Sequence, residues 1–289
     1  MLDADAWFTT HPPLARLLQM LCDLARDEHD EDFGYRIPAH VYVCVTPDGS
    51  VLLDLKRDKY FGMGRTETLS LAAIVPGWPK PVWGEGPCGA PQESDVKAGA
   101  LSLCESLVSD GLLLRDVGVG SPRAGCRREG QGESGAVEIR RDMTAEWISI
   151  GDELEVASTL GWRDVLNFLW AYLWVRGSLA LRPFAATVES MRVLKARRSD
   201  SRNAWHSHEV AAMVGVFRRL RPFVFPAEGR CLLHALTLVK FLSRYDFHPE
   251  WMIGVTTQPW GAHSWVQWGN FLLDTNPEKV CGYVPILTV

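Results

Sequence analysis

The chain has 289 residues, 47% of them apolar and 22% charged, and its formal net charge is −5. These proportions suffice for one large core or two small ones, and they are ordinary for a soluble protein. The acidic balance gives no support to nucleic-acid binding, so we interpret the basic stretch from Arg192 to Arg202 as a solvated helix face. The seven cysteines include no CxxC pair, which argues for a reducing compartment and against a disulfide framework or a zinc ribbon.

The sequence predicts a cytoplasmic protein without an integral membrane segment. The first five residues are acidic and lack the long apolar core of a signal peptide. The most apolar stretch, Val165 to Leu181, is interrupted by Asn167 and Arg176 and is too short for a convincing span.

The first third of the chain predicts a small mixed module. Leucines at helical spacing predict a helix within residues 12–28, although its role is open. Two apolar runs, 41–45 and 51–55, flank the turn signal Pro47-Asp48-Gly49 and predict a hairpin, and residues 60–63 predict a third strand. A helix is expected over 66–75, then a Pro- and Gly-rich loop over 76–91. A second helix is expected from Ser94, as its cap, to Asp110, with Gly111 ending it.

Glycine, serine and charged residues dominate residues 116–142, which predicts a flexible linker. The expected domains are therefore residues 1–115 and residues 143–289. In the second domain we expect helices over 147–160, 163–181 and 185–198.

Cys231 opens an apolar run to Leu242 that is typical of a buried helix. Pro222, Pro226 and Gly229 keep this helix from starting before about residue 229. Unpaired N–H groups at a helix start favour a thiolate and can hold a developing oxyanion. The alternative is a buried structural cysteine.

Downstream, Gly269-Asn270 predicts a two-residue hairpin turn between apolar stretches. In that register Trp265 faces Asp274 and His263 faces Asn276, so all four side chains share one face of the sheet. His263 and Asp274 then form a diagonal pair, in which the carboxylate accepts the imidazole N–H and the other ring nitrogen takes the proton of Cys231. One more residue in the turn would move Asp274 to the other face, which leaves Asn276 as the open alternative.

The segment from about Trp162 to Asp274 resembles the B proteins of lasso-peptide biosynthesis, which are leader peptidases with a transglutaminase-like fold. The resemblance is carried by three motifs: Cys231-Leu232, Ala262-His263-Ser264-Trp265-Val266-Gln267 and Leu273-Asp274. Ser264 and Gln267 depart from the family's usual small residue and acid. The resemblance implies a catalytic Cys231, His263 and Asp274 and a separate ATP-dependent, asparagine-synthetase-like cyclase as partner.

Three strands followed by helices resemble the winged-helix-like module that recognises leader peptides in such pathways, here in its fused form. Asp54 to Gly62 carries that likeness. An extended leader would pair with the strand edge at Tyr60, Phe61 and Met63, and the helix from Ser94 would form the opposite wall. The alternative is a module that only packs against the catalytic half. Trp265 and Trp260 flank His263 and are expected to shape the substrate cleft or to pack in the core.

The predicted architecture is thus α+β: an N-terminal winged-helix-like peptide-recognition module and a C-terminal papain- or transglutaminase-like cysteine peptidase domain. The predicted partner is the leader of a ribosomally made precursor peptide. A transglutaminase or amidase would use the same triad, and a non-catalytic leader-binding scaffold is the alternative of another class. His206 and His208 could be metal ligands on a strand but lack a third ligand, and His234 is interpreted as a packed or capping residue rather than the base. No phosphate-binding motif occurs, so neither a metal nor a cofactor is predicted.

Overall fold

The computed structural model describes residues 33–81, 93–117, 147–150, 160–196, 206–226 and 229–289. The chain divides into two compact units, residues 1–34 with 115–125 and residues 35–114 with 126–289. The predicted helix within 12–28 lies outside the described residues, as does nearly all of the predicted linker over 116–142. Strands β1 (Phe33–Arg36) and β5 (Leu114–Val117) form a two-stranded sheet.

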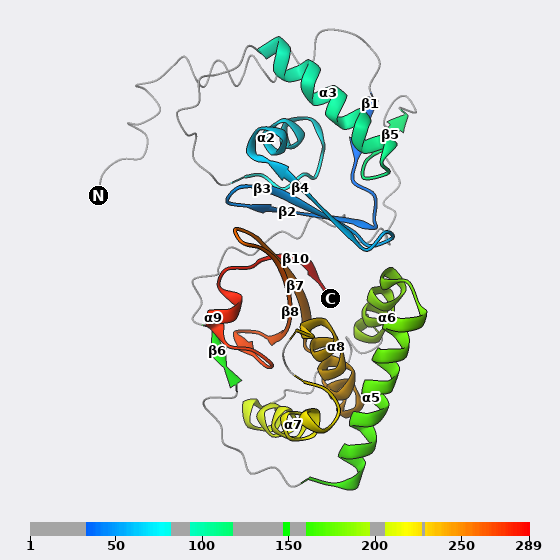
Figure 1. Cartoon of the computed structure of the whole chain (residues 1–289), viewed down its shortest axis with the longest axis vertical. Helices are drawn as coiled ribbons and strands as arrows, with labels where there is room; N and C mark the ends of the chain where they lie inside the picture. Colours follow the sequence, from blue (N-terminus) through cyan, green and yellow to red (C-terminus); the bar gives the residue numbers. More distant parts are fainter. Residues whose placement is uncertain (1–32, 82–92, 118–146, 151–159, 197–205, 227–228) are drawn as a thin grey trace, which may run out of the picture. The chain divides into compact units, whose positions relative to one another are not determined.

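A three-stranded antiparallel sheet follows β1, as the apolar pattern predicts (Figure 1). Its order is β2 (Val41–Thr46), β3 (Gly49–Asp54) and β4 (Lys59–Gly64). Gly49 is required at the first turn because its φ is +153° and a Cβ there would lie 1.9 Å from the Met63 carbonyl oxygen. At the second turn the buried Asp54 carboxylate accepts the backbone N–H groups of Lys56 and Arg57, which stabilises the bend.

Two helices complete this module at the predicted positions. They are α2 (Arg65–Ile74) and α3 (Glu93–Ser109), and Gly111, with φ of +67°, lies just past the end of α3. There the Leu112 N–H donates to the Leu107 carbonyl, as at a helix end closed by a left-handed glycine. These strands and helices follow one another in the predicted order, and both the winged-helix-like class and the peptide-recognition role stay predictions. The apolar core includes Val41, Val43, Leu52, Leu71, Cys104 and Leu107.

The C-terminal part contains a five-stranded sheet in the order β10, β7, β8, β9, β6. Its long members are β7 (Glu250–Thr257), β8 (Trp260–Trp268) and β10 (Val284–Thr288), and its short ones are β6 (Ile148–Ser149) and β9 (Phe271–Leu272). β7 pairs antiparallel with β8 and with β10, whereas β6 runs parallel to β9. The expected helix over 147–160 is therefore wrong at its start, because Ile148 and Ser149 pair with a strand more than 120 residues away. Residues 151–159 lie outside the described part.

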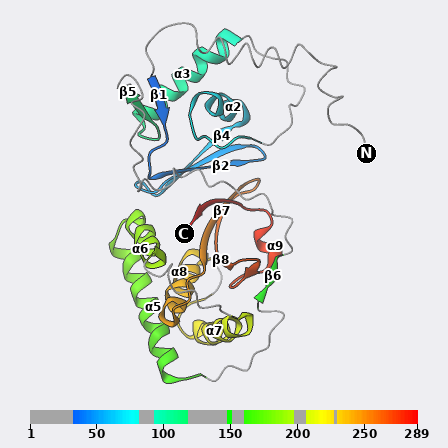
Figure 2. The same ribbon diagram turned by 180° about the vertical axis from the view of Figure 1, so that it is seen from behind.

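The C-terminal part also contains several helices, two of which pack against a third (Figures 1 and 2). They are α5 (Trp162–Leu181), α6 (Phe184–Ala196), α7 (Ser207–Leu220), α8 (Cys231–Leu242) and the short α9 (Pro277–Val280), with 3-10 turns at Arg221–Phe223 and Ser243–Tyr245. The predicted α5, α6 and α8 are confirmed within two residues at each end. α7 was not predicted, although its buried residues Val210, Val214 and Phe217 recur at helical spacing.

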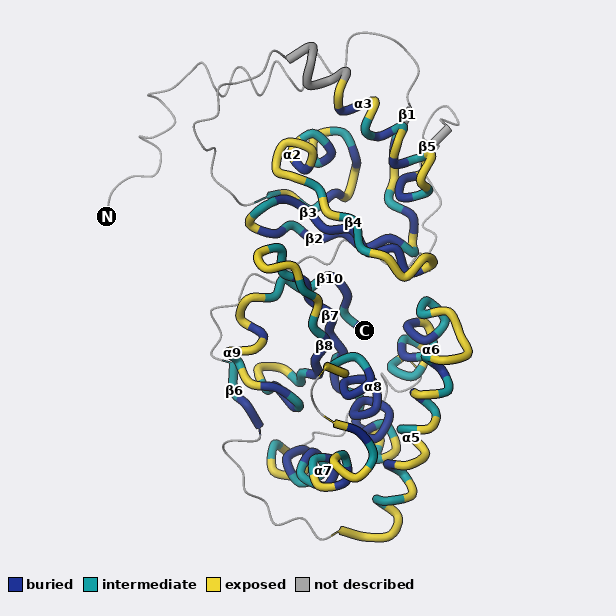
Figure 3. The backbone as a smooth tube through the Cα atoms, viewed as in Figure 1, coloured by how far each residue is buried: buried dark blue, intermediate teal, exposed yellow. Residues whose placement is uncertain are grey.

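Helix α8 is the core of the C-terminal part. It packs against α5, α7 and strands β7 and β8, and every residue from Leu233 to Leu242 is buried. Figure 3 shows this buried helix beside the largely exposed outer side of α5. Phe168, Phe217 and Phe241 contact one another edge to face or tilted, with ring centroids 5.4–6.3 Å apart. The helix start is therefore held on a rigid element.

In the described part of the chain no helix is long and apolar enough to cross a membrane.

Candidate active site

Cys231 is the first residue of α8, as predicted. The first helical hydrogen bond runs from the His234 N–H to the Arg230 carbonyl, at 2.9 Å, and no side chain caps this end. The N–H groups of residues 231–233 therefore have no acceptor within the helix. The thiol is free and only partly buried, unlike the buried thiols of Cys44 and Cys104. This setting differs from that of an enclosed structural cysteine.

His263 lies on β8, opposite Gly254 of β7. Its ring contacts Trp265, with centroids 6.1 Å apart, and Tyr283, with centroids 5.4 Å apart. Burial, followed by the positive charge of Lys279, lowers the pKa of His263. Its Nε2 is buried and has no hydrogen-bond partner among the described residues. The ring is therefore held by aromatic contacts and favoured in the neutral form that a general base requires.

The predicted hairpin turn is correct, but the predicted ladder is too long. Trp268 pairs with Phe271 and Gln267 with Leu272, and a last backbone bond joins the Leu273 N–H to the Val266 carbonyl. Beyond this the chain leaves the strand, because Pro277 begins α9 and Asn276 is its N-cap. The expected pairs of Trp265 with Asp274 and His263 with Asn276 are therefore wrong.

The carboxylate of Asp274 instead closes the end of the hairpin. Its Oδ1 accepts the backbone N–H of Val266 at 2.9 Å, where the next backbone carbonyl of a ladder would stand. Burial raises the pKa of Asp274 to about 7, although the Val266 N–H and the charge of Arg218 act in the opposite direction. Asn276 is exposed.

Within the described residues, no hydrogen bond joins Cys231 to His263 or His263 to Asp274. Helix α8 packs against β8, so the elements that carry the thiol and the imidazole are neighbours. The catalytic roles of Cys231, His263 and Asp274 stay predictions.

His234, one turn along α8 from the thiol, is buried as the sequence indicated. Its ring stacks on Phe217 at 5.4 Å and meets Phe225 edge to face. Burial, then the charges of Arg221, Arg218 and His263, lower the pKa of His234 to about 4. Arg218, on α7, and Arg221, in the 3-10 turn that follows it, were not identified from the sequence as charges near His234.

The two tryptophans near His263 differ in burial, and the histidines considered as metal ligands lie at the start of a helix. Trp265 is 1% exposed and packs with Met252, Leu272 and Val280, which favours core packing over direct substrate contact. Trp260 is 55% exposed. The prediction that His206 lies on a strand is wrong. His206 is the exposed N-cap of α7, where its backbone N–H donates to Glu209. The described residues include no cluster of three or more His, Cys, Asp or Glu that could hold a metal ion.

The predicted leader-binding residues lie on an outer strand. Tyr60, Phe61 and Met63 belong to β4, which pairs with β3 on one side, and all three are half-buried. Phe61 and Met63 pack on the module's core. Helix α2 packs on β4 and α3 packs on α2, and the leader-binding roles of these residues and of the helix from Ser94 stay predictions.

Comparison with known proteins agrees with this architecture. Residues 171–288, from within α5 to β10, match the family model described as Transglutaminase-like superfamily. The C-terminal part is therefore a transglutaminase-like domain, of a superfamily that includes cysteine peptidases and acyltransferases. No curated protein and no solved structure matches the chain.

Proposed function

We propose that this chain is a cytoplasmic cysteine peptidase that binds the leader of a ribosomally made precursor peptide and cleaves it from the core during lasso-peptide maturation. The observation that carries the proposal is the half-exposed thiol of Cys231 at the uncapped start of α8, in a transglutaminase-like domain whose β8 carries His263. The outer strand β4 supports leader capture.

In the proposed reaction His263 takes the proton of Cys231, and the sulfur forms a bond to the scissile carbonyl carbon. The free N–H groups of residues 231–233 stabilise the oxyanion. When the C–N bond breaks, His263 returns the proton to the leaving amine of the core peptide. Water then hydrolyses the thioester and releases the leader as a carboxylic acid.

Asp274 would orient the His263 ring through Oδ2, since Oδ1 holds the Val266 N–H. An ionised Asp274 beside His263 would stabilise the imidazolium that forms during the reaction. The freed amine would pass to a separate ATP-dependent cyclase, which the resemblance to lasso-peptide systems suggests as partner.

The test is mass spectrometry of a precursor peptide incubated with the full chain and with Cys231→Ala. We expect two fragments from the unchanged chain and none from Cys231→Ala, with leader binding retained. Cys281→Ala, which removes an exposed free thiol, is the matched control and should cleave normally. Proteolysis by Cys231→Ala would refute the mechanism.

A transglutaminase or amidase with the same nucleophile is the second candidate, because the superfamily match covers both reactions. In that case the precursor would keep its backbone intact and gain or lose the mass of an amide exchange. A non-catalytic scaffold would give neither product, and iodoacetamide would alkylate Cys231 no faster than Cys281.

A further inference from the structure

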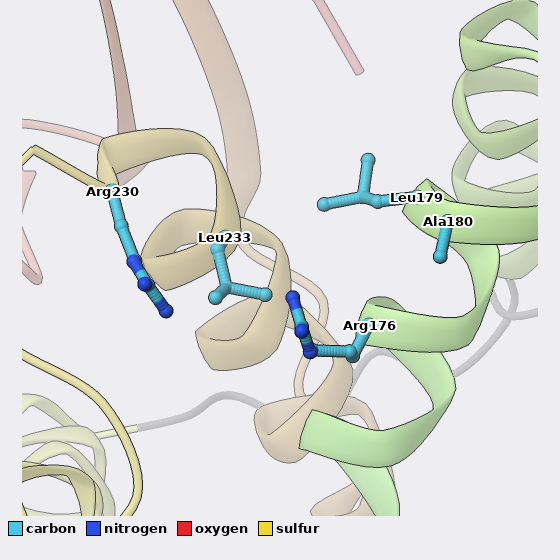
Figure 4. Close-up of a pocket in the computed structure, with 5 residues that line it drawn as sticks. All are labelled: Arg176, Leu179, Ala180, Arg230 and Leu233. Atoms are coloured by element: carbon cyan, nitrogen blue, oxygen red, sulfur yellow. The ribbon is translucent and has the colours of Figure 1, made fainter.

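A pocket of about 220 Å³ lies between α5 and the start of α8. α5 contributes Arg176, Leu179 and Ala180, and the other wall consists of Arg230 and Leu233 (Figure 4). None of these residues belongs to the proposed triad, and Arg230 directly precedes the proposed nucleophile. The pocket therefore lies beside the first turn of α8, outside the proposed triad.

The charge in this pocket is not balanced by the described part of the protein. Arg176 and Arg230 are both exposed, and neither forms an ion pair with a described carboxylate. By contrast, Arg57 and Arg192 each lie within 4 Å of a carboxylate, on Asp54 and Glu189. Figure 4 shows the two guanidinium groups on either side of the Leu233 side chain. Guanidinium groups are the side chains best suited to bind a carboxylate.

The remaining lining is apolar. Leu233 is buried, and Leu179 is half-buried on the facing helix. A ligand that fits both features has a negative group on a short aliphatic stem. Among peptide side chains, aspartate and glutamate have this form.

The distance from the thiol limits where such a side chain lies in the substrate. Arg230 directly precedes Cys231, whereas Leu233, two residues after it, lies about 200° round the helix, so the pocket and the thiol are separated by about the 10 Å width of the helix. An extended peptide advances about 3.3–3.6 Å per residue. A side chain in the pocket therefore belongs to a residue within about three positions of the bond attacked.

We propose that the Arg176–Arg230 pocket binds the carboxylate of an Asp or Glu side chain of the peptide substrate, within about three residues of the scissile bond. This subsite rests on the proposed peptidase function for its substrate. The cationic pocket itself can be tested without any peptide.

The first experiment compares iodoacetate with iodoacetamide, which alkylate thiols by the same reaction and differ in charge. Their rate ratio at one cysteine does not depend on the fraction of thiolate. We expect the iodoacetate-to-iodoacetamide ratio at Cys231 to exceed that at exposed Cys281 by about 3- to 10-fold at low salt. Arg176→Gln with Arg230→Gln should bring the two ratios together, whereas Arg163→Gln, near the other end of α5, should not. Equal ratios in the unchanged chain, or no effect of the double change, would overturn the proposal.

The second experiment uses fluorogenic peptides in which Glu or Gln occupies each position within three residues of the cleaved bond. At one position we expect kcat/KM to favour Glu by about 3- to 10-fold, and the double change should abolish this preference. Equal cleavage of all Glu and Gln pairs would overturn the subsite. If no peptide or precursor is cleaved, the peptidase function fails, while the alkylation ratios still decide whether the pocket attracts anions.

Discussion

Strands β4 and β8 both come next to a hairpin turn, yet they are suited to different tasks. β4 pairs with β3 along its whole length, no described strand pairs beyond it, and none of its side chains is fully buried. β8 pairs with β7 over eight residues, and the Asp274 carboxylate and β9 close its other edge near the end. An open edge offers backbone groups to an extended peptide, whereas a strand that is paired with β7 and packed against α8 holds a side chain in place.

The strongest test of this contrast is His263→Ala on β8. Loss of a general base should lower kcat/KM by about 10²- to 10⁴-fold, measured with a cleavable precursor peptide. Gln267→Ala on the same strand, which loses part-buried hydrogen bonds to Glu250 and from Trp265 but no titratable group, is the control and should stay within a factor of a few. Comparable losses of kcat/KM in both variants would mean that activity depends on the integrity of β8 and not on the imidazole of His263.

Asp274→Asn tests how the end of β8 is closed. Since burial raises the folded-state pKa of Asp274 from 3.8 to about 7, its contribution to stability is fully present below about pH 4 and is lost as pH rises to 7. Asparagine removes this dependence. Between pH 4 and 7 the unchanged chain should lose free energy of unfolding relative to the variant, on the order of a few kcal/mol, as measured by urea denaturation.

His234 is expected to affect the pH dependence of stability in the opposite direction, so its contribution to the free energy of unfolding has to be separated from that of Asp274. Its folded-state pKa is lowered to about 4, so its contribution is present above pH 6.5 and lost as pH falls to 4. The comparison is therefore made between Asp274→Asn and the unchanged chain at each pH. A difference that does not vary with pH would show that the carboxyl group is not desolvated.

Gly254→Ala tests the close packing of Gly254, on β7, against the Trp265 ring, on β8. A Cβ at Gly254 would lie 2.7 Å from two carbons of the Trp265 ring, which overpacks the strand pair and should cost about 1–3 kcal/mol. Gly261→Ala in the same hairpin, whose Cβ would meet its neighbours no closer than 3.5 Å, should cost much less. Thermal unfolding of both variants gives the comparison, and equal midpoints would contradict the packing of Trp265 on Gly254.

The smallest effect is expected at the edge of β4. Strand addition uses the N–H groups of alternate peptide residues, so single N-methyl groups along a synthetic leader should weaken binding with a period of two. Each affected position should lose about 2- to 10-fold in Kd, measured by fluorescence anisotropy with Cys231→Ala. Losses that follow side chains and show no alternation would exclude strand addition.

Much of the fold is readable from the sequence where the signal is local. The Pro47-Asp48-Gly49 turn predicts the first hairpin, and Gly269-Asn270 predicts the second with the observed pairing of Trp268 and Phe271. The helical spacing of Val210, Val214 and Phe217 also indicates α7, but only His206 and His208 were considered in this segment. Of the candidate site, the helix start at Cys231 and the strand position of His263 were predicted, and the place of Asp274 was not.

Backbone preferences act over a few residues, so the amino-acid order alone determined the turns, the alternation along the strands and the first residue of α8. Contacts between distant segments depend on how side chains fill space and pair their charges, which no local pattern encodes. The tertiary structure therefore decided the pairing of β6 with β9, the bond from Val266 to Asp274 and the position of Arg176 and Arg230 in the wall of one pocket.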